Sequence, residues 1–289
     1  MEPYVYFHFF LNGLAHSTCF FLLAAGLSLI FGVLGIFNMA HGAFFMIGAY
    51  FTFQLVQWTQ NFWLCFVASP LLVAVVGFLV ERFLLRCVYR ISVNFQLLLT
   101  FGLILVIEDA TRLIWGVQWR TVEEADLLKG SISLLGMDYP RYNLFHIAAG
   151  FLVFVGLCIF LYRTKFGKTV VAASSDRELA NGLGINVPRM YTVVFCLGAW
   201  LAGLMGVLHA PLININLDMG HKYIITAFAV VVIGGLRSVV GAYAGSLILG
   251  QLTAFGTLYV PFFERLFMFL FMALVLIWRP QGLFGEAKA

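Results

Sequence analysis

The chain has 289 residues, of which 62% are hydrophobic, 17% aromatic and only 10% charged. This composition lies outside the range of soluble globular domains and within that of polytopic membrane proteins, because a core in water cannot bury so much apolar surface. The formal net charge of +4 is small and the basic residues form no stripe, which argues against a nucleic-acid-binding surface.

Apolar stretches follow one another along the whole chain. A membrane-spanning helix needs about 20 mostly apolar residues. The stretches near this length are 9–31, 39–58, 62–81, 94–115, 143–162, 190–209, 223–236, 239–257 and 262–278. The seventh is short and ends in a Gly-Gly pair, which is typical of a broken or re-entrant helix. We predict an all-α polytopic protein, one transmembrane domain over 1–289, with eight or nine transmembrane helices.

Asn38 and His41 lie where the first stretch gives way to the second. Either Asn38 caps the second helix, which we favour, or the two residues belong to a gate or a substrate path. Gly234 and Gly235 are the other candidates for a path, because a helix that breaks there would expose backbone groups along it. His41 has no second ligand at metal spacing, so we predict no metal site there.

Cysteines are scattered through the apolar stretches and show neither Cys-x-x-Cys nor His-paired spacing. We interpret them as small packing residues, and not as disulfides or metal ligands. They are Cys19, Cys65, Cys87, Cys158 and Cys196.

Charged residues near the end of the fourth stretch are spaced for an ion pair. Glu108 and Arg112 are four residues apart, the favourable order for a pair on one helix face. We predict that they pair near a membrane surface, in preference to a role in docking another protein.

Lysine and arginine predict the orientation. If the polar segment 163–189 is cytoplasmic, alternation of the helices places eleven basic residues on the cytoplasmic side and six outside. The positive-inside rule then puts the N-terminus outside and the C-terminus in the cytoplasm. The loop 116–142, which holds several acidic residues, faces outward.

The segment 163–189 also predicts a short helix of its own. Ser175 and Glu178 have the spacing of a capping box, and Gly182, Gly184 and Pro188 end the helix after about two turns. So short a helix is marginal in water. It therefore docks either on the ends of its own transmembrane helices or on a soluble partner.

Glycines in two of the later stretches are predicted to let helix backbones approach closely. Gly203 and Gly206 lie in one of them, and Gly241 and Gly245 have a Gly-x-x-x-Gly spacing in another. We interpret all four as helix-packing residues.

Motifs for chemistry are missing from the sequence. It has no phosphate-binding Gly-x-x-x-x-Gly-Lys-Ser/Thr, no His-Glu-x-x-His, no Gly-x-Ser-x-Gly and no arginine-rich voltage-sensing helix. We therefore predict a transport path, and neither an enzyme nor a cofactor-binding protein.

Five ordered blocks cover nearly the whole chain. They are GLSLIFGV (26–33) with NMAHG (38–42) and GAY (48–50); TKFG (164–167) with DRELA (176–180) and GIN (184–186); LAGLMGVL (201–208); VIGGLRS (232–238); and RPQGLFG (279–285). Together they resemble the permease subunits of the branched-chain (hydrophobic) amino-acid ABC import family.

The resemblance implies a multi-subunit importer in the bacterial inner membrane. Its parts would be two homologous permeases, two cytoplasmic ATPase subunits and an extracytoplasmic substrate-binding protein, with ATP hydrolysed on the ATPases and the path opened by alternating access. The resemblance makes the short helix of 163–189 a coupling helix seated on the ATPase. Its contact residues would be Ser174, Ser175, Asp176, Arg177, Glu178, Leu179, Ala180 and Gly184.

Several alternatives stay open. Close relatives of this family carry urea or short-chain amides in place of aliphatic amino acids. A secondary transporter or channel would need no ATPase, but usually shows an intramembrane carboxylate or an internal repeat. A membrane-embedded enzyme would need convergent His, Asp or Ser residues inside the spans. The sequence shows no intramembrane carboxylate, no internal repeat and no such convergent set of residues.

Overall fold

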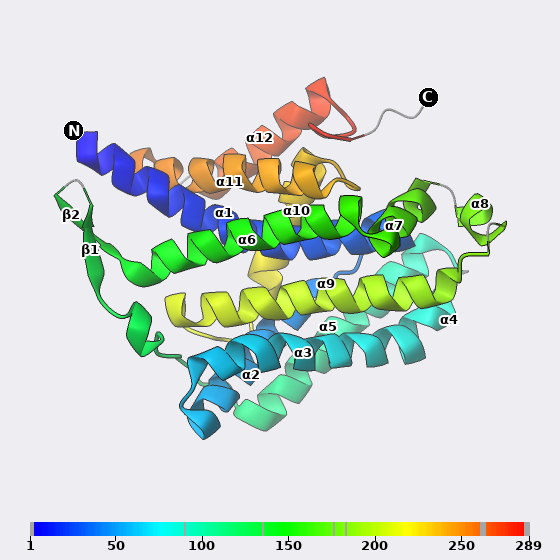
Figure 1. Cartoon of the computed structure of the whole chain (residues 1–289), viewed down its shortest axis with the longest axis horizontal. Coiled ribbons are helices and arrows are strands. Elements are labelled where there is room, and N and C mark those ends of the chain that lie inside the picture. The colour runs from blue at the N-terminus through cyan, green and yellow to red at the C-terminus, as the bar shows by residue number, and fades with distance from the viewer. Residues whose placement is uncertain are drawn as a thin grey trace.

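The computed structural model describes residues 3–89, 91–134, 136–175, 177–182, 184–260 and 264–285. Figure 1 shows a bundle in which α1, α3, α6, α9 and α11 run along its longest axis. The main helices are α1 (Pro3–Leu34), α2 (His41–Thr59), α3 (Phe62–Val80), α5 (Val93–Trp115), α6 (Arg141–Arg163), α9 (Val187–His209), α10 (Met219–Gly234), α11 (Val239–Tyr259) and α12 (Glu264–Trp278). Each overlaps one of the apolar stretches of the sequence.

Five helical segments of the described chain are long and apolar enough to cross a membrane. They are Val5–Leu34, Phe62–Val88, Arg141–Arg163, Val187–Leu212 and Val239–Tyr259. Met219–Gly234 and Leu266–Trp278 are apolar but shorter. At 1.5 Å per residue α10 is about 24 Å long, less than the hydrocarbon thickness of a bilayer. The structure therefore supports a multi-pass helical protein, and the count of eight or nine crossings stays a prediction.

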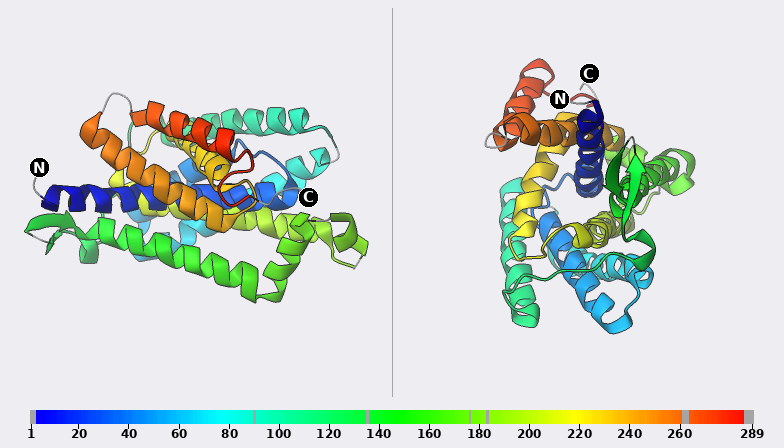
Figure 2. Two further views of the ribbon diagram at one scale, coloured as in Figure 1. Left: turned by 90° about the horizontal axis from the view of Figure 1, so that it is seen from above. Right: turned by 90° about the vertical axis from the view of Figure 1, so that its left-hand side faces the viewer.

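Helix α1 is the centre of the bundle. It packs against α11, α9, α10 and α6, and Figures 1 and 2 show it between α11 on one side and α9 on the other. Its spanning window is 94% buried by protein. A helix that is apolar all round and enclosed by others belongs in a core.

The outer helices present large apolar side chains to their surroundings. Leu98, Val106 and Leu113 of α5 and Phe151 and Leu152 of α6 are more than half exposed. An apolar surface of this extent is incompatible with water and is expected of lipid-facing helices.

The polar connections gather at two opposite ends of the bundle. One, the hairpin end, holds the start of α1, a 3-10 turn (Asp126–Leu128) and the strands β1 (Ser131–Leu134) and β2 (Met137–Pro140). The other, the α7–α8 end, holds the helices α7 (Lys165–Ser175) and α8 (Arg177–Gly182) and the segment after α12.

The β-hairpin corrects the all-α prediction. β1 and β2 pair antiparallel, with Ile132 opposite Tyr139, and Gly136 in their connection has a φ of 84°. Tyr139 is buried, and its hydroxyl donates to Asn12 Oδ1 of α1 (3.2 Å). The fold is thus nearly all helical, with one hairpin tied to α1.

Candidate functional site

The segment 163–189 folds as two helices, where the sequence predicted one. The Thr164 hydroxyl donates to Phe160 O (2.6 Å) and accepts from Gly167 N (3.0 Å), so it turns the chain directly from α6 into α7. Gly167, Val170 and Ala173 form the buried face of α7. The prediction missed α7 because its glycine and β-branched residues have low helix propensity. Burial of this face against the bundle outweighs that propensity.

Helix α8 carries four of the eight predicted contact residues, those at 177–180, whereas Ser174 and Ser175 end α7 and Gly184 follows α8. It ends at Gly182, Ala180 is buried, and Gly184 has a φ of 82° that favours glycine. Asp176, with the side chains of residues 175–179, lies outside the described residues, and with them the predicted capping box.

Hydrogen bonds at this end join α7–α8 to the spanning helices. The Arg237 guanidinium donates to Ser174 O (3.3 Å), which connects α7 to the turn between α10 and α11. Ile185 N donates to Ala180 O (3.1 Å), which ties α8 to the short segment before α9. Asn186 of that segment caps α9 by accepting from Arg189 N (3.1 Å), so a displacement of α8 would be passed to α9.

A buried carboxylate near α8 was missed by sequence reasoning. Glu81 is fully buried in a π-helical turn that continues α3. It accepts hydrogen bonds from the Tyr89 and Thr192 hydroxyls (both 2.7 Å), and Arg86 Nε lies 4.0 Å from it. A buried carboxylate needs such partners, and π-turns are frequent at functional sites. The available signal was an acid directly after a long apolar run.

The favoured reading of Asn38 as a helix cap is wrong. The residue that precedes α2 is Ala40, and no side chain caps the helix. Asn38 is fully buried, and neither polar atom of its side chain has a hydrogen-bond partner among the described residues. His41 is also buried and its Nε2 lies 3.1 Å from Leu23 O, which fastens α2 to α1. Asn38 is thus a polar group that the fold leaves unsatisfied.

Gly234 and Gly235 form a tight junction at the α7–α8 end. Leu283 N donates to Ile233 O (2.8 Å) and Phe284 N to Gly234 O (3.0 Å), so the end of α10 is paired with the segment after α12. Gly235 has a φ of 109°, and a Cβ there would meet Gly285 N at 2.7 Å. In this conformation these carbonyls bond to protein and do not line an open route.

The four packing glycines lie at helix crossings. A Cβ on Gly203 would meet Pro70 and Val73 of α3, and one on Gly206 would meet Gly48 and Ala49 of α2. A Cβ on Gly241 or Gly245 would meet the backbone of α10. Close backbone approach of this kind holds helices together where lipid removes the hydrophobic drive.

The predicted Glu108–Arg112 pair is replaced by two others. Arg112 pairs with Asp109 (3.1 Å), and Glu108 Oε1 lies 2.7 Å from His221 Nε2 at the start of α10. Helix periodicity alone could not show that α10 begins beside α5.

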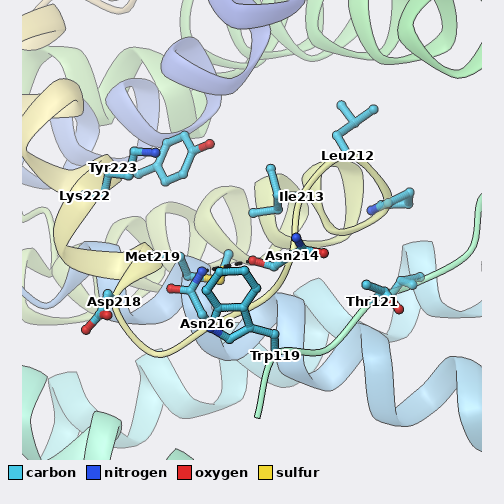
Figure 3. A pocket seen from close by; sticks show the side chains of 12 residues that line it. Trp119, Thr121, Leu212, Ile213, Asn214, Asn216, Asp218, Met219, Lys222 and Tyr223 are labelled. Atoms are coloured by element: carbon cyan, nitrogen blue, oxygen red, sulfur yellow. Dashed lines mark hydrogen bonds between the residues drawn. The ribbon is translucent and has the colours of Figure 1, made fainter. Parts of the chain in front are cut away.

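A cavity of about 480 Å³ opens at the hairpin end (Figure 3). Chain segments far apart in sequence enclose it, because Arg120 and Ile215 exchange two backbone hydrogen bonds (3.0 and 2.8 Å). Its lining includes Trp119, Thr121, Leu212, Asn214, Asn216, Asp218, Lys222 and Tyr223. A second cavity of about 500 Å³ shares Asp218, Lys222 and Tyr223 with it. The start of α10 thus presents one acid and one base to both cavities.

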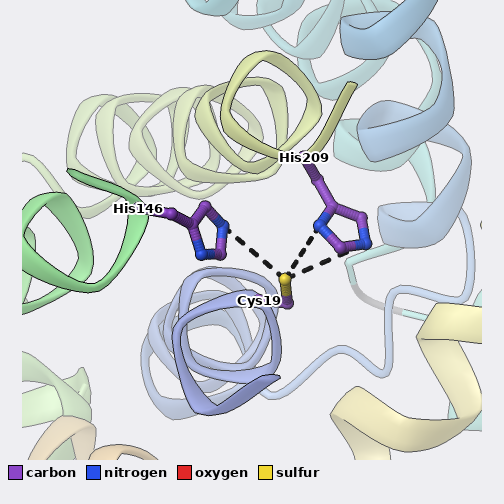
Figure 4. Close-up of side chains that lie close together, drawn as sticks. All are labelled: Cys19, His146 and His209. Atoms are coloured by element: carbon purple, nitrogen blue, oxygen red, sulfur yellow. Dashed lines mark hydrogen bonds between the residues drawn. The ribbon is translucent and has the colours of Figure 1, made fainter. Parts of the chain in front are cut away.

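Cys19, His146 and His209 meet in the interior, against the prediction that the cysteines only pack (Figure 4). They come from α1, α6 and α9, and all three are buried. Cys19 Sγ lies 2.9 Å from His209 Nδ1 and 3.6 Å from His146 Nε2. Spacing along the chain gave no sign of this cluster, because its members are more than 60 residues apart.

Comparison with known proteins places the chain among transport permeases. Residues 9–278 match the family described as branched-chain amino acid transport system / permease component. The chain is 28% identical to the high-affinity branched-chain amino acid transport system permease protein BraD of Pseudomonas aeruginosa, over 99% of this chain and 98% of that protein. It is 28% identical to LivH of Escherichia coli K12 over the same shares of the two chains. It is 26% identical to LivM of that organism, over 92% of this chain and 68% of LivM. No solved structure matches significantly.

Proposed function

The chain belongs to the family of permease components of branched-chain amino-acid transport systems, and we propose that it forms half of the membrane path of an ATP-driven importer. The observation that carries the proposal is the end-to-end similarity to BraD and LivH. The second half would be a homologous permease. Similarity to both LivH and LivM of one bacterium favours a hetero-pair. Two cytoplasmic ATPase subunits and an extracytoplasmic binding protein complete the proposed assembly.

The proposed orientation places the α7–α8 end in the cytoplasm of a bacterial cell with the protein in the inner membrane. It puts the C-terminus inside and the N-terminus outside, in agreement with the positive-inside rule. The hairpin end, with both cavities, would then receive the substrate from the binding protein.

Helix α8, with its flanking residues Ser174 to Gly184, is the proposed coupling helix. Closure of the ATPase pair would displace α8, and Asn186 and the Glu81–Thr192 hydrogen bond would pass the displacement to α9 and α3. Rigid-body rocking of packed helices is an established way to open a path alternately to two sides. Asn38 is the proposed path residue with the best support, because its buried amide is unsatisfied. His41, Gly234 and Gly235 would line the path only in another conformation.

Branched-chain and other hydrophobic amino acids are the proposed substrates. The cavities at the hairpin end combine Asp218 and Lys222 with apolar walls such as Leu212 and Ile213, which fits a zwitterion with an aliphatic side chain. Urea and short amides lack the two opposite charges.

Uptake of radiolabelled leucine and of urea, in cells lacking the gene and in cells with it restored, tests the proposal. We expect leucine uptake alone to depend on the gene. Glu178→Lys should lower both leucine uptake and recovery of the ATPases with the purified permease about tenfold or more, because reversed charge at a docking surface is strongly repulsive. Glu123→Lys, at the exposed hairpin end, is the matched control for recovery of the ATPases, which it should leave unchanged. Uptake without any ATPase would overturn the proposal in favour of a secondary transporter or channel.

A further inference from the structure

The cluster of Cys19, His146 and His209 has the composition of a metal site. Each residue offers one ligand atom, and the three atoms lie within 4.8 Å of one another. The ligands come from α1 and from α6 and α9, which both pack against α1. All three side chains are buried. We propose that this cluster binds one monovalent soft cation, Cu⁺.

Hydrogen bonding alone connects the cluster only weakly. Two imidazole nitrogens lie near the Cys19 sulfur, and a thiol offers them one weak donor and one weak acceptor. A metal ion between the three residues would accept lone pairs from both imidazoles and the sulfur, so that one bound ion uses all three groups.

The surroundings hold His209 as a metal ligand is usually held. Its Nε2 lies 2.7 Å from the Tyr223 hydroxyl, which leaves Nδ1 directed at the sulfur. Metal-binding imidazoles commonly use their second nitrogen in this way. The Tyr142 hydroxyl donates to Leu208 O (2.9 Å) and so fastens the start of α6 to the end of α9. Tyr223 also lines both cavities, so one side chain separates them from His209.

The two sulfur–nitrogen distances fit three-coordinate binding after a small adjustment. Bonds of about 2.3 Å to sulfur and about 2.0 Å to nitrogen, the lengths found for zinc, place the two ligand atoms about 3.7 Å apart in a trigonal site. The sulfur to His146 distance is already 3.6 Å, and the 2.9 Å distance to His209 must open by less than an ångström.

Charge balance selects a monovalent ion. Binding releases the thiol proton, so the site becomes one thiolate, two neutral imidazoles and the ion. With Cu⁺ the net charge is zero, whereas Zn²⁺ would leave one positive charge in the interior, where unbalanced charge is costly. Thiolate and imidazole are also ligands that Cu⁺ accepts readily.

Binding of Cu⁺, supplied anaerobically as its acetonitrile complex, tests the inference on the full-length chain purified in detergent with its co-purifying subunits. We expect one Cu⁺ per chain in competition with a chromophoric chelator. Cys19→Ser should weaken binding at least about 100-fold, and Tyr223→Phe about 10-fold, as for the loss of an outer-shell partner. Cys87→Ser, at an exposed cysteine, is the matched control and should bind as the parent does.

X-ray absorption at the copper edge keeps the test decisive if Cys19→Ser fails to fold. We expect one sulfur and two nitrogen neighbours around copper in the unmodified protein. A first shell without sulfur, binding that survives Cys19→Ser in a monodisperse protein, or tighter binding of Zn²⁺ than of Cu⁺ would overturn the inference. The test does not depend on transport, so its failure would leave the proposed function untouched.

Discussion

The two ends of the bundle are built in opposite ways. At the α7–α8 end the backbone of α10 is paired with the segment after α12, and glycines bring helices into direct contact. At the hairpin end, two cavities of about 480 and 500 Å³ lie around the start of α10. In this conformation the helices are closely packed at the end where α8 lies and hollowed at the other end, which is the asymmetry that the proposed alternating path requires of each of its states.

The largest expected effect on stability comes from a substitution at the tight junction around Gly234 and Gly235. Gly241→Leu would force a side chain into the backbone of Gly234. Overpacking at such a contact is expected to cost about 3 kcal/mol, measured as a lower midpoint of thermal unfolding in detergent. Gly102→Leu is the control, because a Cβ there meets nothing within 4 Å. Equal loss in both variants would show that the junction is not closely packed.

The Glu81 network sharpens the comparison, because it joins α3 to α9 near α8. Glu81→Leu leaves the Tyr89 hydroxyl without its acceptor and leaves the Thr192 hydroxyl only Pro188 O (3.1 Å). We expect a loss of about 1–3 kcal/mol in the free energy of unfolding, together with reduced uptake. A double-mutant cycle with Thr192→Val measures the interaction. Additive effects of the two changes would contradict a direct link.

The cavities predict an effect on uptake with little effect on stability. Lys222→Met removes the base that lines both of them. We expect the KM for leucine uptake to rise about tenfold, the equivalent of about 1.4 kcal/mol of binding, with the unfolding midpoint unchanged. Asp126→Asn changes an exposed charge elsewhere at the hairpin end and serves as the control. An unchanged KM would contradict the proposal that the cavities are part of the substrate path.

The smallest expected effect is a pH dependence at the hairpin end. Burial raises the pKa of Glu124, and the charge of Lys129 partly opposes this. A carboxyl group whose pKa is higher in the folded state destabilises the fold when it is ionised, so stability should rise slightly as pH falls through that pKa. The measurement compares the thermal unfolding midpoints of the parent and of Glu124→Gln at pH values above and below the pKa of Glu124. The difference between the two midpoints shows whether ionisation of Glu124 lowers stability. A parent that loses stability relative to the variant on acidification would contradict it.

The features that could be predicted from the sequence depend on residues that are close together in the chain. Apolar length located the helices, and Gly184 marks the end of α8 as its residue type implies. What it missed depends on residues far apart in the chain. The Cys19 cluster, the Arg120–Ile215 pairing and the Glu108–His221 contact each join different helices or loops. The hairpin was missed because its strands are only four residues long.

The enclosed position of α1 has a consequence for how the protein is made. The helices that surround α1 follow it in the chain, so α1 enters the bilayer before they exist. Two of its hydroxyl groups already have partners within the helix, since Ser17 donates to Gly13 O (2.6 Å) and Thr18 to Leu14 O (3.3 Å). Ser28 instead donates to Leu236 O (3.4 Å), in the turn between α10 and α11, so this hydroxyl gains its partner only after the later helices have been made and have packed around α1.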